Sequence, residues 1–169
     1  CDIESLDVQP QTCELYASAG DDTQQPGHLY LVGNEGQLTD LGPTGFQEVD
    51  ALSFNPDTGK LWGWAQDAGL LRFDNLPNPS ATLVWEPPTV WEVEDITWNV
   101  AGTTLYGVRN LHGDHHPDAH GPLDPELGVE LLAYDTTVPK PKPTSKCEPL
   151  VDSMEIEALD TLPDDRLIY

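Results

Sequence analysis

The sequence predicts an all-β fold, and three observations support this prediction. No stretch shows the apolar periodicity of an amphipathic helix, whereas short runs of alternating apolar and polar residues recur along the chain. Glycine and proline are frequent, with 14 and 16 among 169 residues, which suits many turns between short strands. One short pattern of residues also occurs four times. With 38% hydrophobic residues, the chain has enough apolar material for the core of a single domain.

The repeated pattern encodes a β-hairpin. Its copy at residues 93–108 has a β-branched residue, an acid, a small or acidic residue and an apolar residue, then a turn and a second apolar strand. Other copies begin at residues 3, 49 and 156, so the unit recurs roughly every 40–50 residues, with an insertion before the last copy. Repeats of this length that contain several short strands are typical of β-propeller blades.

The first predicted blade covers residues 3–45. Its inner hairpin is the first copy of the pattern, and its outer hairpin turns at Asn34, Glu35 and Gly36. Alternation of apolar and polar residues places the four strands at residues 3–8, 15–18, 28–32 and 37–41.

The second predicted blade covers residues 46–92 and repeats this order. Pro56 sets the backbone for a type I turn, and Gly59 takes the left-handed conformation that closes the turn. The predicted strands cover residues 49–54, 61–65, 70–73 and 82–85, and proline-rich loops follow the last two.

The third predicted blade covers residues 93–153, and residues 154–169 form part of a fourth. The third blade has predicted strands at residues 93–98, 104–108 and 130–134, and another near 148–151. A run of Pro and Lys at residues 139–143 is expected to be a stiff, extended connector. The prediction is therefore β-propeller blades of four antiparallel strands, about three and a half of them in this chain.

Propellers close into rings of at least four blades, because an open stack of blades exposes apolar faces and strand edges. We therefore expect a protein partner or further blades to complete the ring. The chain would then be a segment of a longer polypeptide, or would assemble with a second copy or another subunit, rather than form a complete monomeric ring. Leu6, Val8, Leu159 and Leu162 are the apolar residues expected on the two open faces.

The chain is strongly acidic, with 30 acids, 7 bases and a net charge of −23. This charge argues against a nucleic-acid partner, because such proteins neutralise phosphates with basic residues. A solvated acidic surface is the preferred interpretation, and a field that concentrates cations is the alternative. No apolar run has the length of a membrane-spanning helix, so no membrane-spanning segment is expected.

Three cysteines, Cys1, Cys13 and Cys147, match neither a metal-binding spacing nor a Cys-x-x-Cys redox motif. One disulfide with one unpaired thiol is compatible with the sequence, and the pairing stays open. Cys13 stands where the second copy has the turn glycine Gly59. Lipid anchoring at Cys1 is a further, less favoured alternative.

The second residue of every copy is an acid, and these residues are Glu4, Asp50, Glu94 and Glu157. Each lies near the start of the strand closest to the propeller axis, so we expect the four carboxylates to cluster on one face, with Asp95 as a fifth. Clustered carboxylates repel unless a cation bridges them, and oxygen ligands suit Ca²⁺. Two interpretations stay open, a Ca²⁺ site and hydrogen bonding of each acid to the backbone of a neighbouring blade.

The insertion at residues 110–127 joins the second and third strands of its blade, on the same face as the acids. It contains His112, Asp114, His115, His116 and His120, and imidazole with carboxylate suits Zn²⁺ or another transition metal. The spacing matches no zinc-enzyme motif, so a polar exposed loop is preferred over a metal site.

Four of the five tryptophans are expected to pack between blades rather than to bind sugars. Trp98 stands at the repeat position of Phe54, and Trp62 at that of Tyr16, whereas Trp91 is expected near the rim. No Gly-x-Ser-x-Gly motif or similar nucleophile signature is present, so no catalytic residue is assigned.

The phrases at residues 93–108 and 156–168 resemble extracytoplasmic bacterial β-propellers of the phytase-like and lactonase-like superfamily. The resemblance covers the whole chain and implies Ca²⁺ held by axial carboxylates, here Glu4, Asp50, Glu94 and Glu157. The chain departs from the enzymes of that group because Arg109 is the only base expected on the acid face, which argues against phytase activity.

Together these features favour a non-enzymatic binding and assembly module that is secreted, at the cell surface or in the periplasm, acts in adhesion and is stabilised by Ca²⁺. The alternative is a metal-dependent propeller hydrolase of the phosphoesterase or lactonase type. Its axial acids would hold a metal that activates water, and a histidine of the insertion would act as general base.

Overall fold

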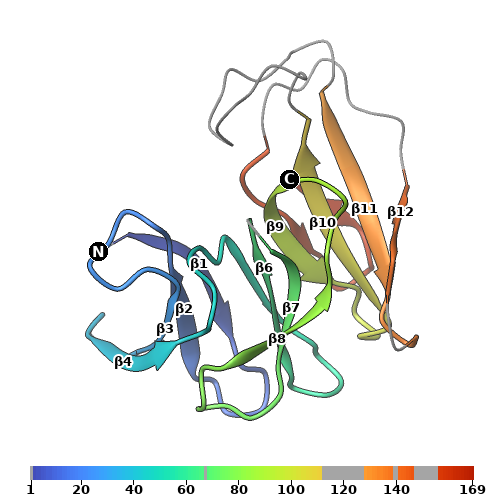
Figure 1. The fold of residues 1–169 in the computed structure, drawn as a ribbon. Helices are drawn as coiled ribbons and strands as arrows, with labels where there is room; N and C mark the ends of the chain where they lie inside the picture. Colours follow the sequence, from blue (N-terminus) through green and yellow to red (C-terminus); the bar gives the residue numbers. More distant parts are fainter. Residues whose placement is uncertain (1, 67, 112–127, 139–140, 147–155) are drawn as a thin grey trace.

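A computed structural model of the chain describes residues 2–66, 68–111, 128–138, 141–146 and 156–169. Within these residues every regular element is a strand, and no helix there is long and apolar enough to cross a bilayer. The strands form three four-stranded antiparallel sheets and one two-stranded sheet, arranged one after another along an arc (Figure 1). The predicted all-β fold of four-stranded blades is confirmed.

The first sheet contains strands β1 (Ile3–Val8), β2 (Leu15–Ala19), β3 (His28–Val32) and β4 (Leu38–Pro43) in chain order. The turn between β1 and β2 requires a left-handed residue, because Cys13 has a φ of 59° there. Gly59 has a φ of 64° in the corresponding turn of the second sheet. Cys13 therefore occupies the turn-glycine position, as predicted, and its thiol is unpaired and exposed.

The second sheet contains β5 (Ala51–Phe54), β6 (Leu61–Ala65), β7 (Gly69–Phe73) and β8 (Ala81–Trp85). Asn55 holds its first turn together, because its Oδ1 accepts hydrogen bonds from the backbone N–H groups of Asp57 and Thr58 at 3.0 and 2.8 Å. Gln9 makes the same kind of bonds in the equivalent turn of the first sheet. In the third sheet the Oδ1 of Asn99 instead accepts from the N–H groups of Thr103 and Thr104, at the far side of the turn.

The third sheet contains β9 (Glu92–Trp98), β10 (Thr104–Asn110), β11 (Val129–Asp135) and β12 (Pro143–Ser145). The prediction of its fourth strand was wrong in position, because β12 pairs Ser145 with Leu132 and starts inside the predicted connector. Proline is tolerated at the first residue of an edge strand, where no ladder N–H is needed. Residues 148–151 lie outside the described residues.

The last copy of the pattern forms a small hairpin of β13 (Asp160–Thr161) and β14 (Leu167–Ile168). The strands that begin each copy are neighbours in sequence order, since β5 contacts both β1 and β9, and β13 contacts β9. The four inner strands β1, β5, β9 and β13 therefore surround one axis, with the rest of each sheet extending outward.

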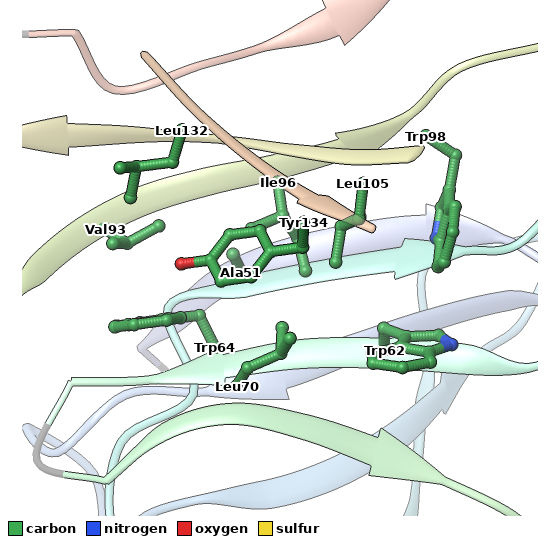
Figure 2. Packing of buried hydrophobic residues seen from close by; sticks show 10 residues of the cluster. All are labelled: Ala51, Trp62, Trp64, Leu70, Val93, Ile96, Trp98, Leu105, Leu132 and Tyr134. Atoms are coloured by element: carbon green, nitrogen blue, oxygen red, sulfur yellow. The ribbon is translucent and has the colours of Figure 1, made fainter. Parts of the chain in front are cut away.

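The hydrophobic core lies between sheets. Between the second and third sheets, Trp64 and Tyr134 are fully buried (Figure 2). Each packs against Trp85, with ring centres 6.1 and 6.0 Å away. Trp62 meets Trp98 edge-on at 5.5 Å. A second cluster, which includes Tyr16 and Phe54, fills the space between the first two sheets. Packing of one blade on the next is therefore what buries the apolar face of each.

Candidate functional site

Side chains of each inner strand alternate between the two neighbouring blades. Ser5 and Asp7 of β1 face the second blade, where they accept hydrogen bonds from the backbone N–H groups of Leu52 and Phe54. Asp95 of β9 likewise accepts from Leu159 N–H at 2.7 Å. A polar side chain of one blade thus binds the inner-strand backbone of the next blade.

The acid at the second repeat position lies at an irregularity in the inner hairpin. In β1, Ile3 pairs with Ala19 and Ser5 with Ser18, which leaves Glu4 as an extra residue. Glu94 is the extra residue of β9 in the same way. A β-bulge turns a side chain out of the ordinary alternation. Glu4 and Glu94 therefore lie together at the end of the propeller where the inner strands start, which we call the acid face.

The structure brings three of the four predicted acids together. Burial raises the pKa of Asp50 to about 9, and the charges of Glu48, Glu94 and Glu4 raise it further. The pKa of Glu4 is raised by burial first, and then by neighbouring acids that include Glu94. Glu157 is exposed at the base of the last hairpin. The acid face is thus a set of mutually repelling carboxylates.

The predicted metal sites are not tested by this geometry. Within the described ranges, no group of three or more His, Cys, Asp or Glu side chains is arranged to hold a metal ion. The Ca²⁺ site at Glu4, Asp50, Glu94 and Glu157 therefore stays a prediction. The predicted transition-metal ligands His112, Asp114, His115, His116 and His120 lie outside the described residues. Asn110, the last residue of β10, pairs with both Glu92 and Val129.

Asp95 does not belong to the acid face, contrary to the prediction. It follows the bulge at Glu94, so its side chain faces the last hairpin and binds Leu159 N–H. Burial raises its pKa to about 6, and the charges of Asp160 and Asp7 add to this effect. The reason is the alternation of the strand, which sends consecutive side chains to opposite sides.

The inner strands of all four copies line one cavity of about 470 Å³, which we call the axial cavity. Repeat positions are counted from the β-branched residue that opens each copy, at residues 3, 49, 93 and 156. The polar lining comes mainly from the third and fifth positions, and the apolar lining comes from the fourth position and from the end of the chain. The lining residues are Leu6, Asp7, Leu52, Ser53, Asp95, Ile96, Thr97, Ala158, Leu159, Asp160, Ile168 and Tyr169. Burial raises the pKa of Asp7, partly offset by its hydrogen bond from Phe54 N–H.

The sequence analysis missed the fifth repeat position, which holds Asp7, Ser53, Thr97 and Asp160. A signal was present, because this position carries a hydroxyl or a carboxylate in every copy, next to an apolar residue. In a single strand such a residue is expected to face solvent. Only the packing of four inner strands shows that it faces a shared cavity.

Arg109, the base expected on the acid face, is already engaged. Its guanidinium carbon lies 4.1 Å from the centre of the Trp91 ring, and its Nη1 lies 3.4 Å from Glu130 Oε2. Burial lowers the pKa of Arg109, while the charge of Glu130 opposes this effect. Trp91 packs against Trp85 at 5.1 Å, so it belongs to the core between blades rather than to the rim as predicted.

The fold and the axial arrangement define the chain as part of a β-propeller. No protein-family model matches the sequence, and no curated protein sequence matches it either. Solved structures do match. The chain is similar to an auxiliary nutrient binding protein from Bacteroides thetaiotaomicron, with 15% identity, a TM-score of 0.60, and coverage of 86% of this chain and 32% of that one.

Two further structures give the same result. A second auxiliary nutrient binding protein, from Bacteroides ovatus, has 12% identity, a TM-score of 0.58 and coverage of 86% and 32%. A chain of a nidogen/laminin complex has 7% identity, a TM-score of 0.60 and coverage of 85% and 48%. The chain therefore spans about a third of the length of the two nutrient binding proteins, and these likenesses show the fold alone.

The buried carboxyl of Asp50 predicts an unusual pH dependence. Its folded pKa of about 9 lies above the ordinary value of 3.8, so folding takes up a proton between these values, and the free energy of unfolding falls as pH rises through them. From pH 7 to 9, above the pKa of about 6 of Asp95, we expect the melting temperature of the wild type to fall by about 5 °C or more. Asp50→Asn should remove most of this fall.

Circular dichroism melts of both proteins across this pH range test the prediction. Glu35→Gln is the control, because Glu35 is exposed in the turn between β3 and β4 and should leave the pH profile unchanged. Parallel profiles for the wild type and Asp50→Asn would show that Asp50 does not hold its proton.

Proposed function

We propose that the chain is part of a non-enzymatic β-propeller that acts in binding and assembly, and that further blades or a protein partner cover its first blade. The observation that carries this proposal is the exposure of Leu6. Leu6 is 56% exposed, whereas the equivalent residues Leu52 and Ile96 are 3% and 2% exposed because a preceding blade covers them. Val8 is similarly exposed, in contrast to its buried equivalents Phe54 and Trp98.

The charge of the chain bears on the kind of partner. A net charge of −23 makes contact between two copies costly at low ionic strength. Further blades of the same propeller, or a partner whose contact surface is less acidic, would avoid this cost. The neighbouring structures support a binding role by analogy, since two are auxiliary nutrient binding proteins and one is part of a nidogen/laminin complex.

Two finer features extend the proposal. We propose that the acid face binds Ca²⁺ through Glu4, Asp50 and Glu94, because a cation would relieve the repulsion between these carboxylates, which adds to the effect of burial on the pKa of Asp50. We also propose an extracytoplasmic location in adhesion, and kinship with phytase-like and lactonase-like propellers. The acidity of the chain and the resemblance of its blade sequences support these two points.

The first test concerns the exposed face of the first blade. We expect the 169-residue chain to self-associate or aggregate at micromolar concentration in moderate salt, because burial of a leucine is worth about 1.5–3 kcal/mol. Replacement of Leu6 and Val8 by Ser should weaken this association by about tenfold or more.

Analytical ultracentrifugation measures this association. Val90→Ser is the matched control, since Val90 is 57% exposed in the loop before β9 and has no buried equivalent at the inner strands. A folded wild-type chain that stays monomeric even in high salt, where repulsion between the acidic copies is screened, would contradict the proposed role of the face.

The second test separates a Ca²⁺-stabilised module from a metal-dependent hydrolase. In a module, saturating Ca²⁺ should raise the melting temperature of the wild type by about 5 °C, and Glu94→Gln should abolish most of this rise. Neither protein should hydrolyse esters, lactones or phosphate esters. Metal-dependent turnover that Glu94→Gln removes while the protein stays folded would favour the hydrolase, and an equal Ca²⁺ response in both proteins would exclude the acid face as the site.

A further inference from the structure

We propose that the axial cavity binds a primary ammonium group carried on a hydrocarbon chain, as in a lysine side chain or a free alkyl diamine. This inference rests on the proposed binding function and adds the chemistry of the ligand. Four features of the cavity support it: its walls, its charge, an unsatisfied hydroxyl and the way its carboxylates are held.

The walls suit a hydrocarbon chain. Apolar side chains that stay in place when the first blade is covered line the cavity, and these are Leu52, Ile96, Leu159 and Ile168. The volume of about 470 Å³ lies within the range of small-molecule sites and is many times the ~30 Å³ that one water molecule occupies in the liquid. An aliphatic stem in contact with Ile168 would lose water from apolar surface on both sides, because Ile168 is 47% exposed, whereas Leu52, Ile96 and Leu159 are already buried.

The charge of the cavity is negative and uncompensated by its own lining. Asp7, Asp95 and Asp160 come from three different strands, and their charges act on one another. None of the described residues that line the cavity is basic. A bound cation would replace this mutual repulsion by attraction.

The hydroxyl of Ser53 points to a ligand that donates hydrogen bonds. Ser53 is only 8% exposed and lines the cavity between the aspartates of β1 and β9. Among the described residues its hydroxyl has no hydrogen-bond partner, and it is open to the cavity rather than enclosed by protein. An ammonium group carries three N–H donors, one of which the hydroxyl oxygen is able to accept.

The carboxylates favour an ammonium over a metal ion. Both oxygens of Asp95 are occupied, because they accept hydrogen bonds from Ile96 N–H at 2.8 Å and Leu159 N–H at 2.7 Å. Asp7 is held in the same way by Val8 and Phe54. Such oxygens keep one lone pair each, which is enough for single N–H donors, whereas Ca²⁺ requires six to eight oxygen ligands around it.

A quaternary ammonium fits less well. Recognition of methylated amines relies on the faces of several aromatic rings. Tyr169 is the one aromatic residue among the described residues that line the cavity, and it is largely exposed. The lining therefore selects for N–H donors on the ligand rather than for methyl groups.

Isothermal titration calorimetry of the purified protein near neutral pH tests this proposal. The probes are cadaverine, which is a linear diamine, and Nα-acetyl-lysine N-methylamide, with 1-pentanol as a comparator that lacks the ammonium. We expect saturable binding of an amine and none of the alcohol. Tighter binding of the lysine derivative would identify a protein side chain as the source, and tighter binding of the diamine would identify a free amine.

Variants locate the site. Ser53→Ala and Asp95→Asn should weaken amine binding by about tenfold to a hundredfold, since each removes an acceptor for a charged donor. Ser53→Ala is the safer variant, because its hydroxyl makes no bond to a described residue and its loss should leave the fold intact. Asp57→Asn is the matched control, because Asp57 lies exposed in the turn between β5 and β6 and should leave binding unchanged.

Three results would overturn the proposal: no saturable amine binding, equal affinity in the wild type and Ser53→Ala, or displacement of the amine by Ca²⁺ at matched ionic strength. Each is distinguishable from failure of the proposed function. Turnover of an ester or phosphate would end the non-enzymatic role without changing the amine affinity, and absence of amine binding would leave the assembly role to be judged by ultracentrifugation.

Discussion

Each inner strand packs against the preceding blade and hydrogen-bonds to the next one, and the rest of the structure depends on this double contact. Its even-numbered repeat positions face the preceding blade, where Leu52 and Ile96 are buried. Its odd-numbered positions face the next blade, where Asp7 and Asp95 accept hydrogen bonds from the next inner strand. Because no blade buries its own faces, every blade both covers one neighbour and is covered by another.

This arrangement separates two acidic surfaces that look alike in the sequence. Glu4 and Glu94 lie at β-bulges at the start of inner strands, so they gather on the acid face with Asp50. Asp7 and Asp95 lie further along the same strands and turn into the axial cavity. The carboxylates of the acid face repel one another beside solvent, whereas those of the axial cavity are fixed by backbone N–H groups beside apolar walls. Different ligands are therefore expected, a metal cation at the acid face and an organic cation in the axial cavity.

The sequence predicted local features well and contacts between blades less well. The inner hairpin of the second blade, for example, was predictable because Pro56 and Gly59 define its turn within a few residues. The strand that starts at Pro143 was missed because proline disfavours most strand positions, and its edge position is set by pairing with β11, where Pro143 lies opposite Tyr134. Ser53 was missed for a related reason, since its surroundings come from three other repeats. The sequence of one strand does not indicate which residues of the neighbouring blade lie opposite a polar side chain.

The last hairpin docks on the third blade through Asp95 and so completes the axial cavity. Amide hydrogen exchange of Leu159, followed by nuclear magnetic resonance, tests this docking, because the Leu159 N–H donates to Asp95 across the blade boundary. We expect Leu159 to exchange slowly in the wild type and at least about tenfold faster in Asp95→Ala, while Leu105 within the third sheet changes little. Rapid exchange of Leu159 in the wild type, at the rate of a solvated loop, would show that the last hairpin does not dock there.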